Sequence, residues 1–338
     1  MLNINFKATT LTYNLTIVSP VTFSQTTKGL VSRKILNIKA RNTYHCGGTM
    51  REEKCVLPFT RKAERIIDDY LDTISKKINE LGFKISEERK RDFLLAIKHS
   101  LKLSSIKYAK KKKSEIVREQ HVKETVSRVP PSRLIKHALQ TPQIFLHVEE
   151  LRRKHFQMIR KKLESSSETG IILDAGCEYG RQLMEFLRHG WKFEFLGVDI
   201  DLEALRYGKS VEPSIDFIRA DIEGSLPFKD NSFDVIICIG VLNFTKKGAN
   251  EAVREFARVL KPNGLLFIIQ SLTRSKLISI IAYLAWKIVP KIGRLYRKTQ
   301  MEKILRQNKF THLIIDKAFF LPLTLSDVYF YTALQSKD

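Results

Sequence analysis

An acid and two glycines follow a short apolar run at residues 171–180, which read Ile-Ile-Leu-Asp-Ala-Gly-Cys-Glu-Tyr-Gly. A buried strand that ends at Asp174 and turns through Gly176 and Gly180 leaves free backbone N–H groups at the start of the next helix. Such an edge can hold the polar part of a nucleotide-like ligand. The dinucleotide pattern Gly-x-Gly-x-x-Gly is not met, because charged residues stand where its second and third glycines belong.

Further apolar runs downstream predict the strands that would complete such a site. Phe193–Asp201 is expected to be a second strand with Asp199 near its carboxyl end, and Ile215–Asp221 a third strand that also closes on an acid. A carboxylate that ends the second strand of a doubly wound sheet can accept hydrogen bonds from both ribose hydroxyls. The fourth and fifth strands are expected at Val235–Ile239 and Leu265–Ile269.

The order and spacing of these segments resemble the class I S-adenosylmethionine-dependent methyltransferases, in particular the type-11 family with its ubiquinone and menaquinone biosynthesis enzymes. The stretch from Asp174 fits Asp-x-Gly-x-Gly-x-Gly except at Glu178, and the turn Lys261-Pro-Asn-Gly264 precedes the fifth strand. The resemblance runs from about Ile171 to the C-terminus. It implies a Rossmann-like, doubly wound seven-stranded mixed sheet with an antiparallel last strand, and S-adenosylmethionine as the cofactor.

The same resemblance implies a role for individual residues. The turn from Asp174 to Gly180 would face the methionine part of the cofactor, Asp199 would hold the ribose, and Ile200 would pack on the adenine. Asp221-Ile222 would contact the adenine amino group and ring, and Ile239 would pass near the sulfonium. The cofactor-binding residues predicted in this way are Asp174, Gly176, Glu178, Gly180, Asp199, Ile200, Asp221, Ile222 and Ile239.

Two departures from the family pattern affect the predicted chemistry. Glu178 replaces a glycine where the cofactor comes close, so it would either crowd the ligand or place a carboxylate beside its charged end. After the fourth strand the chain reads Val241-Leu242-Asn243-Phe244, where relatives often carry Glu-His. All eight histidines lie outside residues 190–311, so no local general base and no catalytic residue is assigned. Asn243 is compatible with orienting an acceptor and with capping a turn.

Several other reactive residue types have a simpler structural interpretation. Asp201 is expected to cap the helix that follows it, and Asp234 to open the fourth strand. Cys177 and Cys238 are expected to be small buried fillers rather than nucleophiles. His155 lies at seam spacing on a predicted helix and is expected to be a core or rim histidine rather than a catalyst.

The net charge of +23 is concentrated outside the predicted cofactor region. Residues 1–170 carry 35 Lys and Arg against 17 Asp and Glu, whereas residues 171–270 carry 12 against 15. A basic half favours an RNA partner as an alternative acceptor. However, the Asn/Asp-Pro-Pro-Tyr motif of enzymes that methylate exocyclic amines is absent, and no Pro precedes any cysteine, as cytosine-C5 enzymes require.

The chain is longer than one such domain needs, and three regions are predicted. Residues 1–49 contain no acid and six Lys and Arg, and form a basic tail expected to be disordered. Residues 50–140 form a basic helical extension, in which Lys110–Lys113 is expected to open a third, charged segment ended by Pro130-Pro131. Residues 141–338 form the methyltransferase domain, with a lid insertion at 274–298.

Four cysteines without a disulfide framework indicate a reducing, cytoplasmic location, although the composition of the tail is also that of an organellar transit peptide. Cys46 and Cys55 beside His45 are spaced too widely for a zinc knuckle and lack a fourth ligand, so no metal is predicted. There is no apolar run of the length that spans a bilayer.

The lid insertion is the second segment with a chemical signal. Leu277–Val289 is apolar except for Ser279 and Lys287, and further cations follow it up to Lys298. It fits either a lid helix whose apolar face covers the acceptor pocket or an interfacial helix that makes a peripheral membrane contact through residues 277–298. Both interpretations indicate a hydrophobic acceptor.

The sequence therefore predicts an S-adenosylmethionine-dependent methyltransferase that acts on a small-molecule or lipid-like acceptor. Because the cofactor is already activated, positioning and alignment can carry much of the catalysis without a general base. An RNA methyltransferase that uses the basic N-terminal half is the first alternative. The second is a degenerate, non-catalytic cofactor-binding subunit, which Glu178 and Asn243 keep open.

Overall fold

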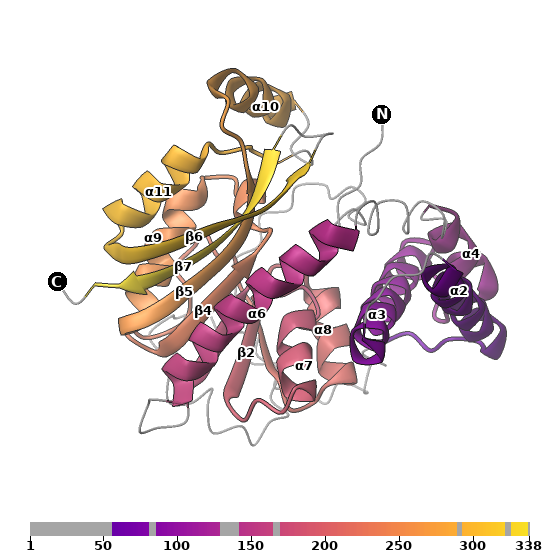
Figure 1. The fold of residues 1–338 in the computed structure, drawn as a ribbon. Coiled ribbons are helices and arrows are strands. Elements are labelled where there is room, and N and C mark those ends of the chain that lie inside the picture. Colours follow the sequence, from indigo (N-terminus) through magenta and orange to yellow (C-terminus); the bar gives the residue numbers. More distant parts are fainter. Residues whose placement is uncertain are drawn as a thin grey trace. The chain divides into compact units, whose positions relative to one another are not determined.

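A computed structural model of the chain describes residues 56–80, 86–128, 142–164, 170–288, 293–321 and 326–336. These residues belong to two compact units that divide between Leu146 and His147 (Figure 1). The predicted tail, the pair Cys46 and Cys55 and the Pro130-Pro131 stop lie outside the described residues.

The first unit contains three described helices, α2 (Arg61–Glu80), α3 (Glu87–Lys111) and α4 (Glu119–Arg128). The expected helical character of this region is confirmed, and α2 buries one apolar face with Ile67, Ile74 and Ile78. The prediction that Lys110–Lys113 opens a third segment is wrong. This lysine run ends α3, since buried Leu103, Ile106 and Ala109 continue the helix to its last turn, where cations favour the helix dipole.

The second unit is built on one seven-stranded sheet with the strand order β3-β2-β1-β4-β5-β7-β6. The strands from β1 to β5 run parallel, and β7 runs antiparallel to both β5 and β6. This confirms the predicted mixed sheet. The strands are β1 (Ile171–Ala175), β2 (Glu194–Asp199), β3 (Asp216–Arg219), β4 (Phe233–Ile239), β5 (Leu260–Leu272), β6 (Phe310–Leu321) and β7 (Ser326–Gln335).

Helices cover both faces of this sheet (Figure 1). One face carries α6 (Pro142–Glu164), α7 (Arg181–Arg188) and α8 (Leu202–Val211), and the other carries α9 (Ala249–Val259) and α11 (Lys298–Gln307). The central strands are continuous apolar runs, as two-sided burial requires: residues 233–238 of β4 are all buried. Because helices cover both faces, a ligand can bind only at an edge of the sheet, and in such folds it binds at the carboxyl ends of the parallel strands.

The insertion between β5 and α11 forms the helix α10 (Lys276–Ile288), which stands apart from the sheet (Figure 1). Its side chains Leu277, Ile280, Ile281, Tyr283 and Leu284 are exposed by 42% to 66%. The apolar face of α10 therefore does not close over a pocket in this structure, in contrast to the closed lid that the sequence allowed. No described helix is long and apolar enough to cross a bilayer.

His155 on α6 is a satisfied core histidine, as predicted. Its side chain is fully buried against Phe267 and Phe330, with Nε2 lying 2.9 Å from Asp316 Oδ2 and Nδ1 lying 2.5 Å from Thr332 Oγ1. Burial lowers the pKa of His155, and the neighbouring Asp316 opposes this shift only in part. The imidazole therefore fastens α6 to the sheet in its neutral form.

This burial predicts a loss of stability in mild acid. The folded-state pKa of His155 lies below its ordinary value, so the unfolded chain takes up the proton first as the pH falls below about 6.5. We expect the free energy of unfolding to fall from pH 7 to pH 5 in denaturant titrations, and this slope to flatten in His155→Gln. The exposed residue His189 supplies the control, since His189→Gln should keep the slope. Equal slopes in all three proteins would contradict the assignment.

Candidate active site

The predicted cofactor-binding residues come together at one edge of the sheet. Strands β1 to β4 run parallel, so their carboxyl ends share this edge. It carries Asp174 near the end of β1, Asp199 at the end of β2, Asp221 just beyond β3 and Ile239 at the end of β4. The strand order reverses between β1 and β4, and ligands of open parallel sheets bind at such a reversal.

The turn after β1 is held tightly against β2 and against the loop after β4. The N–H groups of Gly176 and Cys177 both donate to the carbonyl oxygen of Val198, at 2.7 and 3.0 Å. Gly176 has φ 81°, and a Cβ atom there would collide with the side chain of Val241. Glycine is therefore required at this position by both the backbone conformation and the close approach.

Phe217 on β3 packs into a recess formed by three glycines, which belong to β2, to α8 and to the turn before α7. A Cβ atom on Gly180, Gly197 or Gly208 would lie 2.6 to 3.0 Å from its ring. The recess lets the turn before α7 and the helix α8 approach the strands closely. Sequence reasoning missed Phe217, because these glycines are far apart in the chain and only the fold brings them under one ring.

Asp199 organises the backbone around it through both carboxylate oxygens. Oδ2 accepts a hydrogen bond from the N–H of Glu178 at 2.8 Å, and Oδ1 accepts one from the N–H of Asp201 at 2.9 Å. Each carboxylate oxygen can accept a second hydrogen bond. The side chain can therefore fix the turn after β1 and still receive ligand hydroxyls.

Glu178 takes the backbone conformation that a glycine would take. Its φ is 55°, in the left-handed region, and its N–H donates to Asp199. The side chain is half-buried. The turn thus keeps the backbone geometry that the glycine pattern predicts. Glu178 adds a carboxylate to this turn, four residues after the buried acid Asp174.

The residues beyond β2 and β3 differ in their exposure. Ile200 is 58% exposed and is the one large hydrophobic side chain outside α10 that is exposed in the described part of the chain. Asp221 is exposed, and its Oδ1 accepts the N–H of Glu223 at 3.0 Å. Ile222 instead packs in the core with 7% exposure. Exposed Ile200 and exposed Asp221 thus offer an apolar side chain and a carboxylate at this edge of the sheet.

The end of β4 leaves open space in front of its backbone. Gly240 follows Ile239 with φ 65°, and its N–H donates to the carbonyl oxygen of Ile269 at 2.8 Å. A Cβ atom on Gly240 would meet nothing within 4 Å. A ligand can therefore come close to the main chain here.

Glu223, which follows β3, is hydrogen-bonded to the loop after β4. Its carboxylate is buried and accepts the N–H groups of Lys246, Lys247 and Gly248, which lie at the start of α9. An anion is favoured at such a helix start. No local pattern in the sequence indicates this contact, because its partners lie more than 20 residues away.

Asn243 is the buried polar residue on the acceptor side. It lies in the short 3₁₀ helix η1 (Leu242–Phe244), and its Nδ2 donates to the carbonyl oxygen of Ser271 at 3.1 Å. Its Oδ1 is buried without a hydrogen-bond partner among the described residues, and the residue is 9% exposed. Asn243 therefore joins η1 to β5, and its Oδ1 is a buried acceptor that no described group satisfies.

The simpler interpretations of the other reactive residues are confirmed. Asp201 caps α8, because its Oδ1 accepts the N–H groups of Glu203 and Ala204. Asp234 accepts the N–H of Ile171 and the Nζ of Lys261, and so joins three strands at their amino ends. The two described cysteines, Cys177 and Cys238, are buried.

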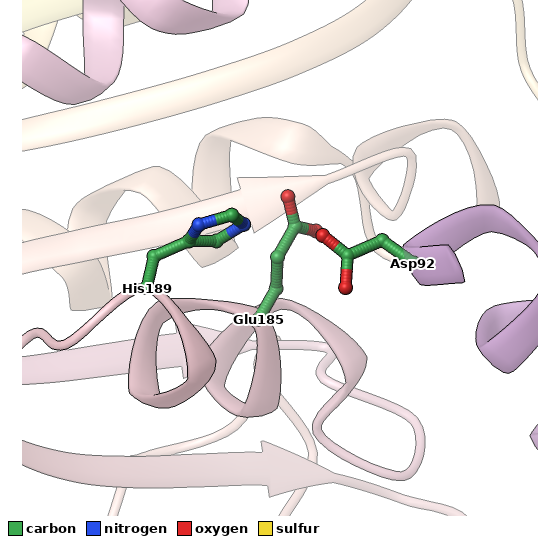
Figure 2. A group of neighbouring side chains, drawn as sticks. All are labelled: Asp92, Glu185 and His189. Carbon is green, nitrogen blue, oxygen red and sulfur yellow. The ribbon is translucent and has the colours of Figure 1, made fainter. Parts of the chain in front are cut away.

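Glu185 and His189 lie one turn apart at the end of α7 (Figure 2). Two side chains from one helix offer at most two metal ligands, and the acid drawn with them, Asp92, belongs to the other unit. We assign no metal site to this group.

Comparison with known proteins finds similarity to methyltransferases. Residues 173–268 match the family model of a methyltransferase domain. Demethylmenaquinone methyltransferase of Chlorobaculum tepidum is 28% identical over 192 residues, which cover 52% of this chain and 77% of that protein. Ubiquinone/menaquinone biosynthesis C-methyltransferase UbiE of Pseudomonas paraeruginosa is 37% identical over 134 residues, which cover 37% of this chain and 51% of that protein.

Among solved structures, the YcgJ protein of Bacillus subtilis superposes on 54% of this chain and 97% of its own length, with a TM-score of 0.43 and 17% identity. At that level the superposition carries no functional information. The matched region, residues 173–268, runs from β1 to β5 and contains every edge residue described above. Residues 173–268 are thus identified as a class I S-adenosylmethionine-dependent methyltransferase domain of the type-11 family, and the chain around them is similar to the two methyltransferases named above.

Proposed function

We propose that this chain binds S-adenosylmethionine at the carboxyl edge of its sheet and transfers the methyl group to a small, hydrophobic or lipid-like acceptor. The observation that carries the proposal is the gathering of Asp199, exposed Ile200, Asp221 and open Gly240 at the strand reversal. This set offers ribose acceptors, an adenine surface and room at the main chain. When bound, the cofactor supplies a methyl group on an activated sulfonium.

The residues of the chain would position the two reactants. Both oxygens of Asp199 have capacity for the ribose hydroxyls beyond their backbone bonds. The free oxygen of Asp221 would accept the adenine amino group, and Asp174 with Glu178 would attract the ammonium end. Asn243 Oδ1 would accept a hydrogen bond from the acceptor. Alignment of this kind can lower the activation free energy of the transfer by roughly 7–11 kcal/mol in well-oriented systems.

A hydrophobic acceptor is favoured by two observations. The similar proteins named above are called demethylmenaquinone and ubiquinone/menaquinone biosynthesis methyltransferases, and the insertion α10 exposes five large apolar side chains. Neither observation favours an RNA acceptor or a non-catalytic subunit.

The test is methylation of a cell extract with S-adenosylmethionine labelled on the methyl group, followed by partition into lipid, RNA and protein fractions. We expect the label in the organic phase, with Asn243→Ala slowing its transfer and leaving cofactor binding unchanged. Label that enters only RNA would replace the proposed acceptor. No transfer by a protein that binds the cofactor would leave a binding subunit instead.

Glu178 offers a separate test of how the turn meets the cofactor. We expect Glu178→Gln to weaken S-adenosylmethionine binding several-fold, because a neutral amide no longer attracts the ammonium group. Glu178→Gly should weaken binding similarly and change stability little, since relief of the left-handed backbone, about 1 kcal/mol, is offset by the greater chain entropy of glycine. Calorimetric titration measures both variants. Tighter binding by Glu178→Gly would mean that the side chain crowds the ligand.

A further inference from the structure

A basic cavity of about 410 Å³ lies away from the candidate cofactor residues, at the other side of the β5 end. Its walls come from the residues after β5, from β6 and β7, and from the first turn of α11. Four of its lining side chains are cationic, and two threonines and a tyrosine add hydroxyl groups. The cations are Arg274, Arg297, Lys298 and Lys317.

The acids around this cavity neutralise only part of its charge. Asp327 pairs with Arg274 at 3.1 Å and with Lys317 at 2.7 Å, and Glu302 pairs with Lys298 at 2.6 Å. Arg297 has no carboxylate partner among the described residues. Two carboxylates thus face four cations, which leaves a local surplus of two positive charges.

The shape and chemistry of the cavity suit a phosphate group. Arg and Lys side chains form short, charge-assisted hydrogen bonds to phosphate oxygens. Arg297, Lys298 and Thr299 also form the start of α11, a helix of ten residues whose first turn favours an anion. Tyr329 adds a hydroxyl, which already lies 3.3 Å from Arg274 Nε and 3.2 Å from Asp327 Oδ2.

The same cavity lies at the base of the α10 insertion. Thr273 and Arg297 form a parallel β-bridge, with the N–H of Thr273 donating to Tyr296 and the N–H of Lys298 donating to Thr273. The two ends of the insertion therefore meet at the cavity wall. Residues 273–298 contain seven Lys and Arg and no acid, and α10 exposes its apolar side chains from this base.

We propose that this cavity binds the phosphate of an anionic lipid, and that α10 contacts the apolar part of the same lipid surface. Exposed apolar side chains flanked by cations are typical of helices that lie in a membrane interface. The proposal rests on the proposed function only in that such a lipid surface would present the hydrophobic acceptor. Phosphate binding itself needs no cofactor.

Flotation of the full chain with vesicles tests the lipid surface. We expect binding to phosphatidylcholine vesicles that contain phosphatidic acid, and little binding to phosphatidylcholine alone. The double variant Arg297→Gln with Lys298→Gln should weaken binding by roughly 30-fold, by the usual contribution of two cations at an anionic membrane. Leu277→Ser with Leu284→Ser should weaken it through α10 while leaving the cavity unchanged.

A matched control uses exposed cations on the same helix outside the cavity, Lys303→Gln with Arg306→Gln. Equal losses in the two double variants would overturn a specific phosphate site and leave general charge attraction. Unchanged flotation of the Leu277 and Leu284 variant would overturn the role of α10. Circular dichroism checks that each variant is folded.

Calorimetry with inorganic pyrophosphate separates the two sources of phosphate. Pyrophosphate binding that Arg297→Gln with Lys298→Gln abolishes, together with competition against vesicles, supports the lipid phosphate. The same binding without vesicle flotation would assign the cavity to a free phosphate compound and overturn the lipid. A parallel S-adenosylmethionine titration shows whether the cofactor edge is intact, so failure here is distinguishable from failure of the proposed methyl transfer.

Discussion

Asp199→Ala is expected to reduce S-adenosylmethionine affinity by at least 100-fold. The substitution removes both carboxylate oxygens that we propose accept the ribose hydroxyls, and each hydrogen bond to a charged group contributes about 1.5–3 kcal/mol. It also releases the N–H of Glu178, so the turn after β1 loses one of its contacts. Isothermal titration of the purified chain measures the affinity. Asp199→Asn keeps one oxygen acceptor. Its affinity for S-adenosylmethionine should therefore lie between that of the unaltered chain and that of Asp199→Ala.

Asp201→Ala is the matched control for this substitution. Asp201 lies two residues further on and caps α8 rather than facing the edge. Loss of the cap should cost about 1 kcal/mol of stability and leave the affinity for the cofactor near that of the unaltered chain. If Asp201→Ala weakened binding as strongly as Asp199→Ala, the ribose role of Asp199 would not hold.

Gly176→Ala is expected to cause the largest loss of stability among single substitutions at the site. The new methyl group would collide with Val241, and φ 81° is unfavourable for any L side chain. The backbone cost is about 1–2 kcal/mol, and overpacking adds about 1–3 kcal/mol. Each kcal/mol lowers the melting temperature of a domain of this size by roughly 2–4 °C, so thermal unfolding resolves the effect.

Two other glycines with positive φ separate the cost of the backbone conformation from the cost of the collision with Val241. A Cβ atom on Gly190, with φ 74°, or on Gly240, with φ 65°, meets nothing within 4 Å. Gly190→Ala should therefore show the backbone cost alone. Gly240→Ala should match it in stability and additionally weaken cofactor binding at least tenfold, because its methyl group enters the open space at the end of β4. Similar melting temperatures for Gly176→Ala and Gly190→Ala would rule out the collision with Val241.

The elements of the sheet were predictable because each is a local pattern. Apolar runs that end in an acid or a glycine turn marked β1 to β4, and the observed strands differ from the expected ones by a few residues at their ends. The third strand, for example, was expected at Ile215–Asp221 and is Asp216–Arg219. The expectation for Lys110–Lys113 fails because the helical spacing of the buried residues before the lysine run, rather than its charge, decides where α3 ends.

The acceptor side was less predictable because its contacts join distant segments. Asn243 matched two interpretations in the sequence, and its contact with Ser271 is set by the pairing of β4 with β5. Glu223 carries no motif, yet it holds the loop at Lys246 to Gly248. The exposure of α10 likewise depends on how the insertion leaves the sheet, which no local pattern specifies.

The sequence by itself determined the order of the parallel strands along the chain, the glycine turn through Gly176 and Gly180, and the placing of Asp199 and Asp221 at or just beyond strand termini. These follow from residue type and spacing, because strand termination and glycine conformations are local. Only the tertiary structure decided that Val241 closes on Gly176, that Phe217 fills a recess of three glycines and that four cations surround one cavity. Those contacts depend on strand order and register, which bring together residues that are remote in the chain.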